Sequence, residues 1–506
     1  MTATVSPDRV PAVIAAVHTG LFIDGRWGPA TSGATFGVSD PATGDLLTDV
    51  ADGGVDDARR ALECAGAHQA AWAATSPRMR SEILYRAYEL LVERADDVAA
   101  VMTAEMGKPL AEARGEVAYG AEFFRWFAEE AVRIGGDHII TGDGAGRIVV
   151  SKQPVGPCIL VTPWNFPLAM GTRKIGPAIA AGCTMVFKPA ELTPLTALML
   201  AGILAEAGLP DGVLNVVTTS DPGAVVGEWM SSPIARKVSF TGSTEVGKTL
   251  LGQAAGTVMR TSMELGGNAP FIVCADADID RAVDGLIVAK MRNMGQACTA
   301  ANRIFVHRAV IEEFTARLTA RMDALVMGPG SATGTQVGPL VEAKAVDKVS
   351  ALVEDALDRG ARVVTGGTRP PGPGNFYPPT VLTDVHPESA LMQTEIFGPV
   401  AALIPFGSDD PGDPDGDGID EVLAAANDTP WGLVGYVYTQ DIDRADRFSD
   451  GLQVGMVGIN TGLVSNPAAP FGGVKESGLG REGGRVGIEE FLNVKYVARP
   501  IRGATG

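Results

Sequence analysis

The chain has 506 residues, of which 46% are apolar and 20% charged, a length and composition typical of about two or three globular domains. Its 41 basic and 60 acidic side chains give a net charge of −19. Such a surface repels nucleic-acid phosphates and anionic membranes, so neither is an expected partner. A small anionic substrate would instead need arginines placed locally in its binding site.

The cysteines and apolar runs indicate a cytoplasmic protein without a metal. No run approaches the roughly twenty apolar residues of a membrane span, and the first residues lack a basic leader. The five cysteines are scattered and show no paired ligand spacing, so we expect no disulfide framework and no zinc site. They are Cys64, Cys158, Cys183, Cys274 and Cys298.

The first third of the chain predicts a helical region entered through a short hairpin. We expect residues 1–20 to form a flexible tail and residues 21–27, LFIDGRW, to form two strands joined by a turn. Between residues 55 and 127 apolar side chains recur three and four positions apart, which predicts helices. Residues 147–152, RIVVSK, alternate in polarity and predict a hairpin-like arm that projects from the body.

From residue 155 onward the sequence pattern becomes typical of an α/β protein. Short apolar runs alternate with segments long enough to be helical crossovers, which predicts a parallel sheet covered on both faces. The pattern resumes after Gly267, so we expect a second α/β domain. The acidic segment 409–420, DDPGDPDGDGID, begins like a calcium loop but has Ala424 at the twelfth position instead of glutamate. A solvated surface loop is the simpler interpretation.

Three residues are candidates for catalysis. Cys298 is flanked by small residues that let backbone amides approach its sulfur, as a nucleophile requires, although most single cysteines are buried apolar residues. Glu264 precedes Leu265 and a flexible glycine pair and could serve as a general base. Asn165 follows an apolar strand and offers an amide donor, but it could equally shape a turn.

Two further segments have features of a dinucleotide site. In FTGSTEVGK, Gly242, Ser243 and Gly247 follow a strand and precede a helix, where backbone amides can hold a pyrophosphate. This spacing departs from GxGxxG, which predicts an unusual cofactor pose. In VFKPAE, Lys188 and Glu191 end a strand and can bind ribose hydroxyls, or they can form a surface salt pair.

Together these segments resemble the aldehyde dehydrogenase superfamily over nearly the whole chain. The resemblance rests on motifs that occur in one order: LFIDGRW, EMGKP (105–109), TPWNFP (162–167), FKPAE, FTGSTEVGK, MELGG, GQAC, EIFGPV (395–400) and PFGGVKESGLGREGG (470–484). It implies that a cysteine thiolate attacks an aldehyde, that the thiohemiacetal gives hydride to the nicotinamide, and that water hydrolyses the thioester. Cys298 is then the nucleophile and Glu264 the base. The Asn165 side chain and the Cys298 N–H form the oxyanion hole.

The resemblance also assigns cofactor residues. A carboxylate at Glu191 accepts bonds from a free 2′-hydroxyl but repels a 2′-phosphate, so we predict NAD over NADP, with NADP possible because Lys188 attracts phosphate. The presence of Glu264 favours hydrolysis over transfer to coenzyme A. The implied cofactor residues are Thr162, Pro163, Trp164, Lys188, Glu191, Gly242, Ser243, Gly247, Leu265, Glu395 and Phe397.

Polar residues in the expected aldehyde tunnel resemble those of succinate-semialdehyde dehydrogenases. Arg173 and Arg292 would clamp a distal carboxylate, with Ser465 beside them and Phe166, Met170 and Phe471 as apolar walls. Succinate semialdehyde is the predicted substrate. The alternatives are another carboxylated or small aldehyde such as glutarate semialdehyde, an inactive structural or binding homologue, and a thiol hydrolase, which the lack of a suitable histidine disfavours.

The superfamily also implies the domain plan. We expect a Rossmann-type dinucleotide-binding domain in residues 21–135 and 156–265 and an α/β catalytic domain in residues 266–470. Residues 136–155 and 485–500 would form a β arm for oligomerisation, giving a homodimer or homotetramer.

Overall fold

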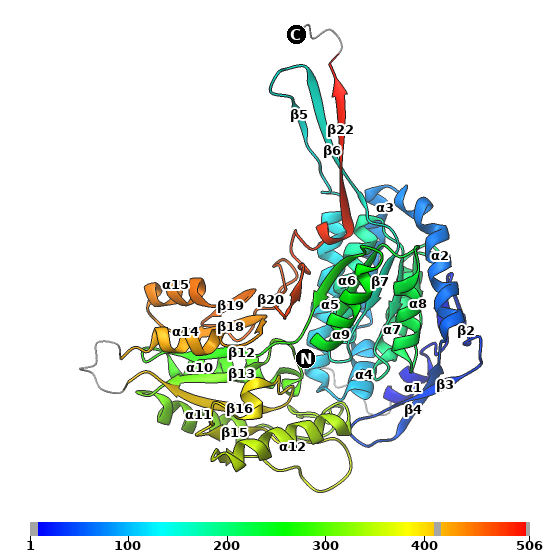
Figure 1. The fold of residues 1–506 in the computed structure, drawn as a ribbon. Coiled ribbons are helices and arrows are strands. Elements are labelled where there is room, and N and C mark those ends of the chain that lie inside the picture. Colours follow the sequence, from blue (N-terminus) through cyan, green and yellow to red (C-terminus); the bar gives the residue numbers. More distant parts are fainter. Residues whose placement is uncertain (1–8, 409–415, 502–506) are drawn as a thin grey trace.

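The computed structural model describes residues 9–408 and 416–501 as two α/β lobes with a projecting β arm (Figure 1). Most of the acidic segment expected to be a surface loop, residues 409–415, lies outside the described residues. Among the described residues, no helix has both the length and the apolar character needed to cross a membrane.

The first lobe contains an eight-stranded sheet whose central five strands, β9, β8, β7, β10 and β11, are parallel, as the sequence predicted. The apolar runs in these strands are buried on both faces, because helices pack on either side. In spatial order the strands are β2 (Arg26–Gly28), β1 (Leu21–Ile23), β9 (Leu214–Val216), β8 (Met185–Lys188), β7 (Cys158–Val161), β10 (Lys237–Thr241), β11 (Arg260–Glu264) and β21 (Gly478–Leu479).

The helices of this lobe begin and end where the local sequence favours it. Ser76 caps α3 by accepting a hydrogen bond from the Met79 N–H, and Pro77 occupies the first helical position. Gly107 ends α4 with a φ of +90°, a conformation that favours glycine. The helices are α2 (Val55–Ala73), α3 (Pro77–Glu93), α4 (Ala95–Met106), α5 (Leu110–Ala131), α6 (Ala169–Ala181), α7 (Pro194–Glu206), α8 (Pro222–Ser231) and α9 (Thr244–Ala255).

Part of the expected flexible tail is ordered. Helix α1 (Arg9–Ala15) carries Ile14 into the core of the first lobe, and Val10, Val13 and Val17 pack against the same core. These four side chains are three or four positions apart and form one apolar face, which explains why the segment docks. The expectation of a loose tail is therefore corrected for these residues.

The second lobe has a seven-stranded sheet with its own apolar core. Its strands, in spatial order, are β14 (Arg362–Thr365), β15 (Thr380–Thr383), β16 (Val400–Phe406), β13 (Ala301–His307), β12 (Ala269–Val273), β18 (Val434–Tyr438) and β19 (Met456–Ile459). The covering helices are α10 (Ile279–Leu286), α11 (Ile311–Asp323), α12 (Ala343–Asp358), α13 (Ala390–Gln393), α14 (Ile419–Asn427) and α15 (Ile442–Gly451).

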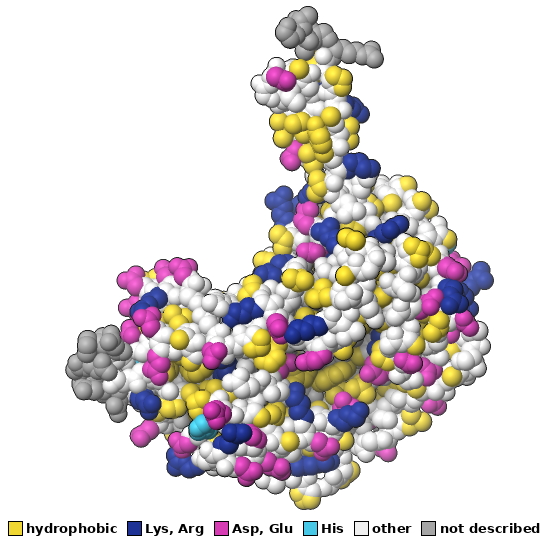
Figure 2. Space-filling model, viewed as in Figure 1, with side chains coloured by type: hydrophobic (Ala, Val, Ile, Leu, Met, Phe, Trp, Pro, Cys, Tyr) yellow, Lys and Arg dark blue, Asp and Glu magenta, His cyan; other side chains and the backbone are white. Residues whose placement is uncertain are grey.

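The remaining strands form an arm and two small ribbons. The arm consists of β5 (His138–Ile140), β6 (Gly146–Pro154) and β22 (Leu492–Pro500), with β6 in the middle. Apolar side chains gather on the projecting arm in Figure 2, among them the exposed Ile139, Ile140, Val494 and Tyr496. The role of the arm in oligomerisation stays a prediction. The ribbons are β3 (Thr35–Ser39) with β4 (Leu46–Ala51), and β17 (Trp431–Gly432) with β20 (Val474–Lys475).

Candidate functional site

A cavity of about 360 Å³ is lined by residues from both lobes and holds most of the residues singled out in the sequence. Segments that end parallel strands of the first sheet meet the loop between α10 and β13 of the second lobe there. The predicted residues that line it are Pro163, Trp164, Asn165, Phe166, Met170, Arg173, Gly242, Ser243, Leu265, Arg292, Cys298, Glu395, Phe397, Ser465 and Phe471. Thr162, Lys188, Glu191, Gly247 and Glu264 are not part of this lining.

Cys298 follows a backbone segment in a rare conformation. Asn293, Met294 and Gly295 all have positive φ angles, of 56°, 55° and 74°, which is costly for the two residues that carry side chains. A side chain at Gly295 would place its Cβ only 2.2 Å from the carbonyl oxygen of Gly398. This segment therefore needs strong support from its surroundings to position the thiol.

Side-chain amides and a carboxylate provide that support. Asn293 Nδ2 donates to the carbonyl oxygens of Asn165 and Gln296, both at 2.9 Å, and its backbone N–H donates to Glu112 at 2.6 Å. Asn165 Nδ2 donates to the same Gln296 oxygen at 3.0 Å. An amide group has two N–H donors, so Asn165, which lines the cavity, retains one for a ligand. The loop that carries Asn165 and the loop that carries Cys298 are thus fastened together.

A buried ion pair holds the Asn165 loop from the other side. Lys108, from the EMGKP motif, pairs with Glu116 and donates to the Asn165 carbonyl oxygen at 2.8 Å. Glu116 in turn accepts from the backbone N–H groups of Leu168 and Ala169 at the start of α6. Every charge in this group is paired, as burial requires. The motif therefore shapes the site without lining the main cavity.

The environment keeps the Cys298 thiol neutral in the absence of ligands. Burial, and secondly the charge of Glu395, raise the pKa of Cys298 to about 12, while Arg173 acts in the opposite direction. Gly267 lies against the loop that carries Cys298, because a Cβ on it would lie 2.8 Å from the Cys298 carbonyl oxygen. This close approach brings the end of β11, where Glu264 is located, next to Cys298.

Glu264 is buried beside an unexpected group of charges. Burial, followed by the nearby charge of Glu482, raises the pKa of Glu264 well above its ordinary value, and its Oε2 atom has no hydrogen-bond partner. Burial alone would also raise the pKa of Glu482, but Lys174 and Arg173 outweigh it and lower that pKa. Lys174 bonds Glu482, and the Nε of Arg173 lies 2.5 Å from the same carboxylate. A buried carboxyl group with a raised pKa beside such a network is a candidate proton acceptor.

The two arginines expected at the aldehyde tunnel both line the cavity, but they differ in whether a carboxylate of the protein already pairs with their charge. Arg173 is buried, pairs with Glu482 and has its guanidinium 4.0 Å from the ring centroid of Phe471; within the described residues its Nη2 has no hydrogen-bond partner. Arg292 is half-buried over the ring of Phe166, and no carboxylate in the described part of the chain forms an ion pair with it. Arg292 is therefore the freer of the two cations.

The opposite end of the cavity has the features of a cofactor site. Gly242 and Ser243 lie where β10 turns into α9, and Ser243 caps that helix, so the N-terminal end of α9 can attract a phosphate. The Gly242 N–H itself donates to the Glu264 carbonyl oxygen at 3.1 Å. Glu395 accepts from the Gly267 N–H at 3.3 Å, and burial raises its pKa to about 7. The rings of Trp164 and Phe397 pack edge to face at 5.4 Å. These residues fit a bound dinucleotide that reaches toward Cys298.

Comparison with known proteins identifies this arrangement. A model of the aldehyde dehydrogenase family matches residues 27–497. The chain belongs to the aldehyde dehydrogenase family. The family and the α/β fold predicted from the motifs are thus confirmed.

Individual relatives of this aldehyde dehydrogenase are similar over nearly their full length. Succinate-semialdehyde dehydrogenase from Paenarthrobacter nicotinovorans is 54% identical over 452 residues, which cover 89% of this chain and 98% of that protein. Glutarate-semialdehyde dehydrogenase from Pseudomonas putida is 49% identical, covering 94% and 96%. The crystal structure of an NADP-dependent enzyme from Escherichia coli is 46% identical, with a TM-score of 0.93 over 98% of this chain and 100% of that chain.

Several residues of the aldehyde dehydrogenase site were not predicted. Tyr119 lines the cavity, and Lys348 lines it near Glu395, whose carbonyl oxygen it bonds at 2.7 Å. Lys174 adjoins the predicted Arg173 in sequence, so it could have been found from that motif, whereas its partner Glu482 is 308 residues away. Only the fold brings the last two together.

Proposed function

We propose that this aldehyde dehydrogenase oxidises succinate semialdehyde to succinate with a nicotinamide cofactor. The observation that carries the proposal is the single cavity that contains Cys298 and two arginines, Arg173 and Arg292. A nucleophile and a carboxylate-binding fork in one small cavity suit an aldehyde with a distal carboxylate. The succinate-semialdehyde dehydrogenase at 54% identity supports the same substrate.

In the proposed reaction the Cys298 thiol first gives its proton to water, and the resulting thiolate adds to the aldehyde carbon and forms a thiohemiacetal. The free N–H of Asn165, together with the Cys298 backbone N–H, stabilises the oxyanion that develops. The cofactor, when bound, supplies the two-electron acceptor that converts this adduct to a thioester. Glu264 then takes a proton from water, which attacks the thioester carbon and releases the carboxylate and the thiol. The raised pKa of Glu264 means that its carboxylate holds a proton more tightly than an ordinary glutamate does, which suits a base that takes a proton from water.

A second candidate substrate is glutarate semialdehyde, which is one methylene longer. A neighbouring cavity of about 280 Å³ shares Tyr119, Phe166, Arg292 and Ser465 with the main one. The second cavity therefore offers space beside Arg292 for one more methylene, whereas the carboxylates of Glu112 and Glu116 in its lining disfavour deeper entry of an acid. The ratio of kcat/KM for the two aldehydes separates the candidates, because a pocket discriminates one methylene by about 10–200-fold when it fits closely.

Arg292→Ala is expected to raise KM for succinate semialdehyde by about 10–100-fold, because it removes a charge-assisted bond to the distal carboxylate. KM for an uncharged aldehyde of similar length should change little. Steady-state kinetics with both substrates provide the measurement. Arg292 is a better choice than Arg173, whose removal would leave Glu482 short of a buried partner and confound binding with stability.

Arg292→Lys is the matched control, since it keeps the charge and loses the planar fork. We expect an intermediate KM for the charged aldehyde. If Arg292→Ala weakened both substrates equally, Arg292 would not be binding the carboxylate.

For the cofactor we propose NAD over NADP, although the similar Escherichia coli structure is of an NADP-dependent enzyme. Glu191 Oε2 lies 2.8 Å from Lys188 Nζ. Burial would raise the pKa of Glu191, but the charge of Lys188, its hydrogen bond and a backbone hydrogen bond together lower the pKa, so the carboxylate is ionised at neutral pH. Such a carboxylate repels a 2′-phosphate and engages the lysine that could otherwise attract it.

Glu191→Ser is expected to raise kcat/KM for NADP by at least about tenfold, because the repulsion is removed and Lys188 is released, and to lower it for NAD. Cofactor kinetics at fixed aldehyde concentration measure both effects. Glu206→Ser, which changes an exposed carboxylate on α7, is a control that should leave the NAD to NADP ratio unchanged. Equal or better efficiency of the parent enzyme with NADP would contradict the proposal.

A further inference from the structure

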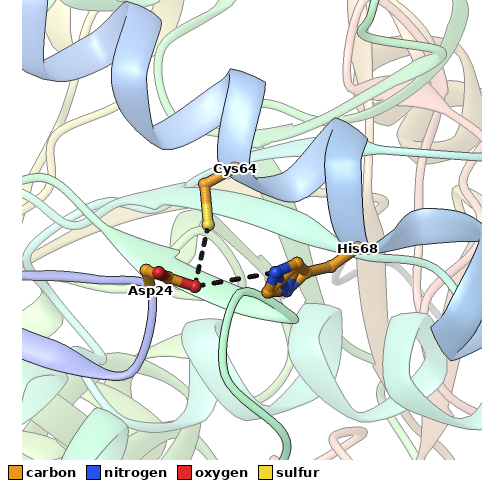
Figure 3. Close-up of side chains that lie close together, drawn as sticks. All are labelled: Asp24, Cys64 and His68. Atoms are coloured by element: carbon orange, nitrogen blue, oxygen red, sulfur yellow. Dashed lines mark hydrogen bonds and ion pairs between the residues drawn. The ribbon is translucent and has the colours of Figure 1, made fainter.

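A cluster of potential metal ligands lies outside the cavity described above. Asp24 is in the turn between β1 and β2, and Cys64 and His68 are one turn apart on α2, with all three side chains directed toward one point (Figure 3). Within residues 9–408 and 416–501, this is the group of at least three such side chains whose donor atoms all lie within 4.8 Å of one another. None of the three lines the catalytic cavity.

The distances match those within a zinc coordination sphere. Asp24 Oδ1 lies 3.5 Å from Cys64 Sγ and 3.7 Å from His68 Nε2. Tetrahedral zinc with bonds of about 2.3 Å to sulfur and about 2.0–2.1 Å to nitrogen and oxygen places its ligand atoms roughly 3.3–3.6 Å apart. The cluster therefore needs only small adjustments to hold such an ion.

A contact outside the cluster orients His68 for binding. Its Nδ1 atom lies 2.7 Å from the carbonyl oxygen of Asp211, which can only accept, so Nδ1 carries the proton. The Nε2 lone pair of a neutral ring is then free on the side of Asp24. A histidine that binds a metal typically has its other nitrogen fixed in this way by a carbonyl or carboxylate. The ring is also packed against Gly212, where a Cβ would lie 2.1 Å from Nδ1.

The charges around the cluster favour a cation. The Asp24 carboxylate places a negative charge 3.7 Å from the ring nitrogen of His68 that faces it, and the same oxygen lies 3.5 Å from the Cys64 sulfur. A bound metal would take Cys64 as the thiolate and displace the thiol proton. Asp211 adds further negative charge near the thiol.

We propose that Asp24 Oδ1, Cys64 Sγ and His68 Nε2 bind a divalent cation of the zinc class. The mixture of thiolate, imidazole and carboxylate favours Zn²⁺ over Mg²⁺ or Ca²⁺, which prefer oxygen ligands. Water completes the fourth position, because the side chains of Asp24 and His68 are 51% and 38% exposed. The bound ion would link α2 to the β1–β2 turn through these side chains. The sequence indicated no metal, because its cysteines show no paired ligand spacing and Asp24 comes from a separate segment.

The test uses the full chain with Cys298→Ser, so that the other accessible thiol does not bind metal. After treatment with a chelator, Zn²⁺ is titrated by calorimetry, and Co²⁺ serves as a spectroscopic probe. We expect one Zn²⁺ per chain, a thiolate-to-cobalt charge-transfer band, and a higher Tm with Zn²⁺. In the same background, Cys64→Ser and His68→Ala should each weaken Zn²⁺ binding by at least about tenfold, and Cys64→Ser should abolish the band.

His386→Ala, which removes an exposed histidine elsewhere, is the matched control and should leave the Zn²⁺ affinity unchanged. Circular dichroism checks that each variant is folded. If Cys64→Ser does not fold, His68→Ala and Asp24→Asn decide the question by the same titration. The proposal is overturned if the Cys298→Ser chain gives no cobalt charge-transfer band, or if the ligand variants bind Zn²⁺ as tightly as it does.

Discussion

Cys298→Ala is expected to lower kcat by about a million-fold, to the level of the uncatalysed background, because the covalent route is lost. No other cysteine of the described residues lines the cavity, so no second thiol can take over. Reduction of the nicotinamide cofactor, followed by absorbance at saturating aldehyde, measures the loss. Cofactor binding should be retained, since the substitution removes only one sulfur from the far end of the cavity.

Cys274→Ala is the control for this experiment. Cys274 is buried in a separate apolar cluster of the second lobe, so its loss should affect stability slightly and kcat little. If Cys298→Ala retained the parental rate, Cys298 would not be the nucleophile and the proposed mechanism would fail.

In the Glu264→Gln variant, steady turnover is expected to be replaced by a rapid burst of cofactor reduction followed by slow turnover. Formation of the thioester should persist, because it depends on Cys298, but hydrolysis loses its base and should slow by about 10²–10⁴-fold. Rapid mixing with aldehyde and cofactor would show about one equivalent of reduced cofactor per chain, followed by a slow phase.

The burst amplitude is an internal control, because it reports how many chains still carry a competent Cys298. Added hydroxylamine, which cleaves thioesters without a protein base, should accelerate the slow phase of the variant more than that of the parent. A variant that lost the burst together with the slow phase would place Glu264 in thiol activation instead of hydrolysis.

The motifs in the sequence predicted the strands and most of the residues that line the cavity. They could do so because each motif reflects the packing needs of its own short segment. Gly267, which must approach the backbone of Cys298, appears in the sequence as part of a glycine pair that closely follows a candidate base. The apolar runs likewise predicted the parallel strands, since their burial on both faces leaves no alternation.

The rest depends on contacts between distant segments. The pairing of Lys174 with Glu482 spans 308 residues, and although Glu482 lies in the 470–484 motif, nothing in that motif shows which residue it pairs with. Glu264 was predicted as a base, but its position beside this pair, outside the cavity lining, was not. The docking of α1 was missed because an apolar face of one and a half turns resembles a short irregular segment.

The left-handed stretch at residues 293–295 leaves little room for substitution, whereas other residues of the site can be replaced more freely. Its geometry is fixed by side-chain amides from several segments and by a glycine with no room for a methyl group. The second cavity beside Arg292 is lined partly by Lys108, Glu112 and Glu116, which help to hold that geometry, and partly by Tyr119, Phe166 and Ser465, which make none of those hydrogen bonds. New aldehyde preferences should therefore arise by substitutions at positions such as Phe166, Tyr119 and Ser465, while the sulfur stays where it is.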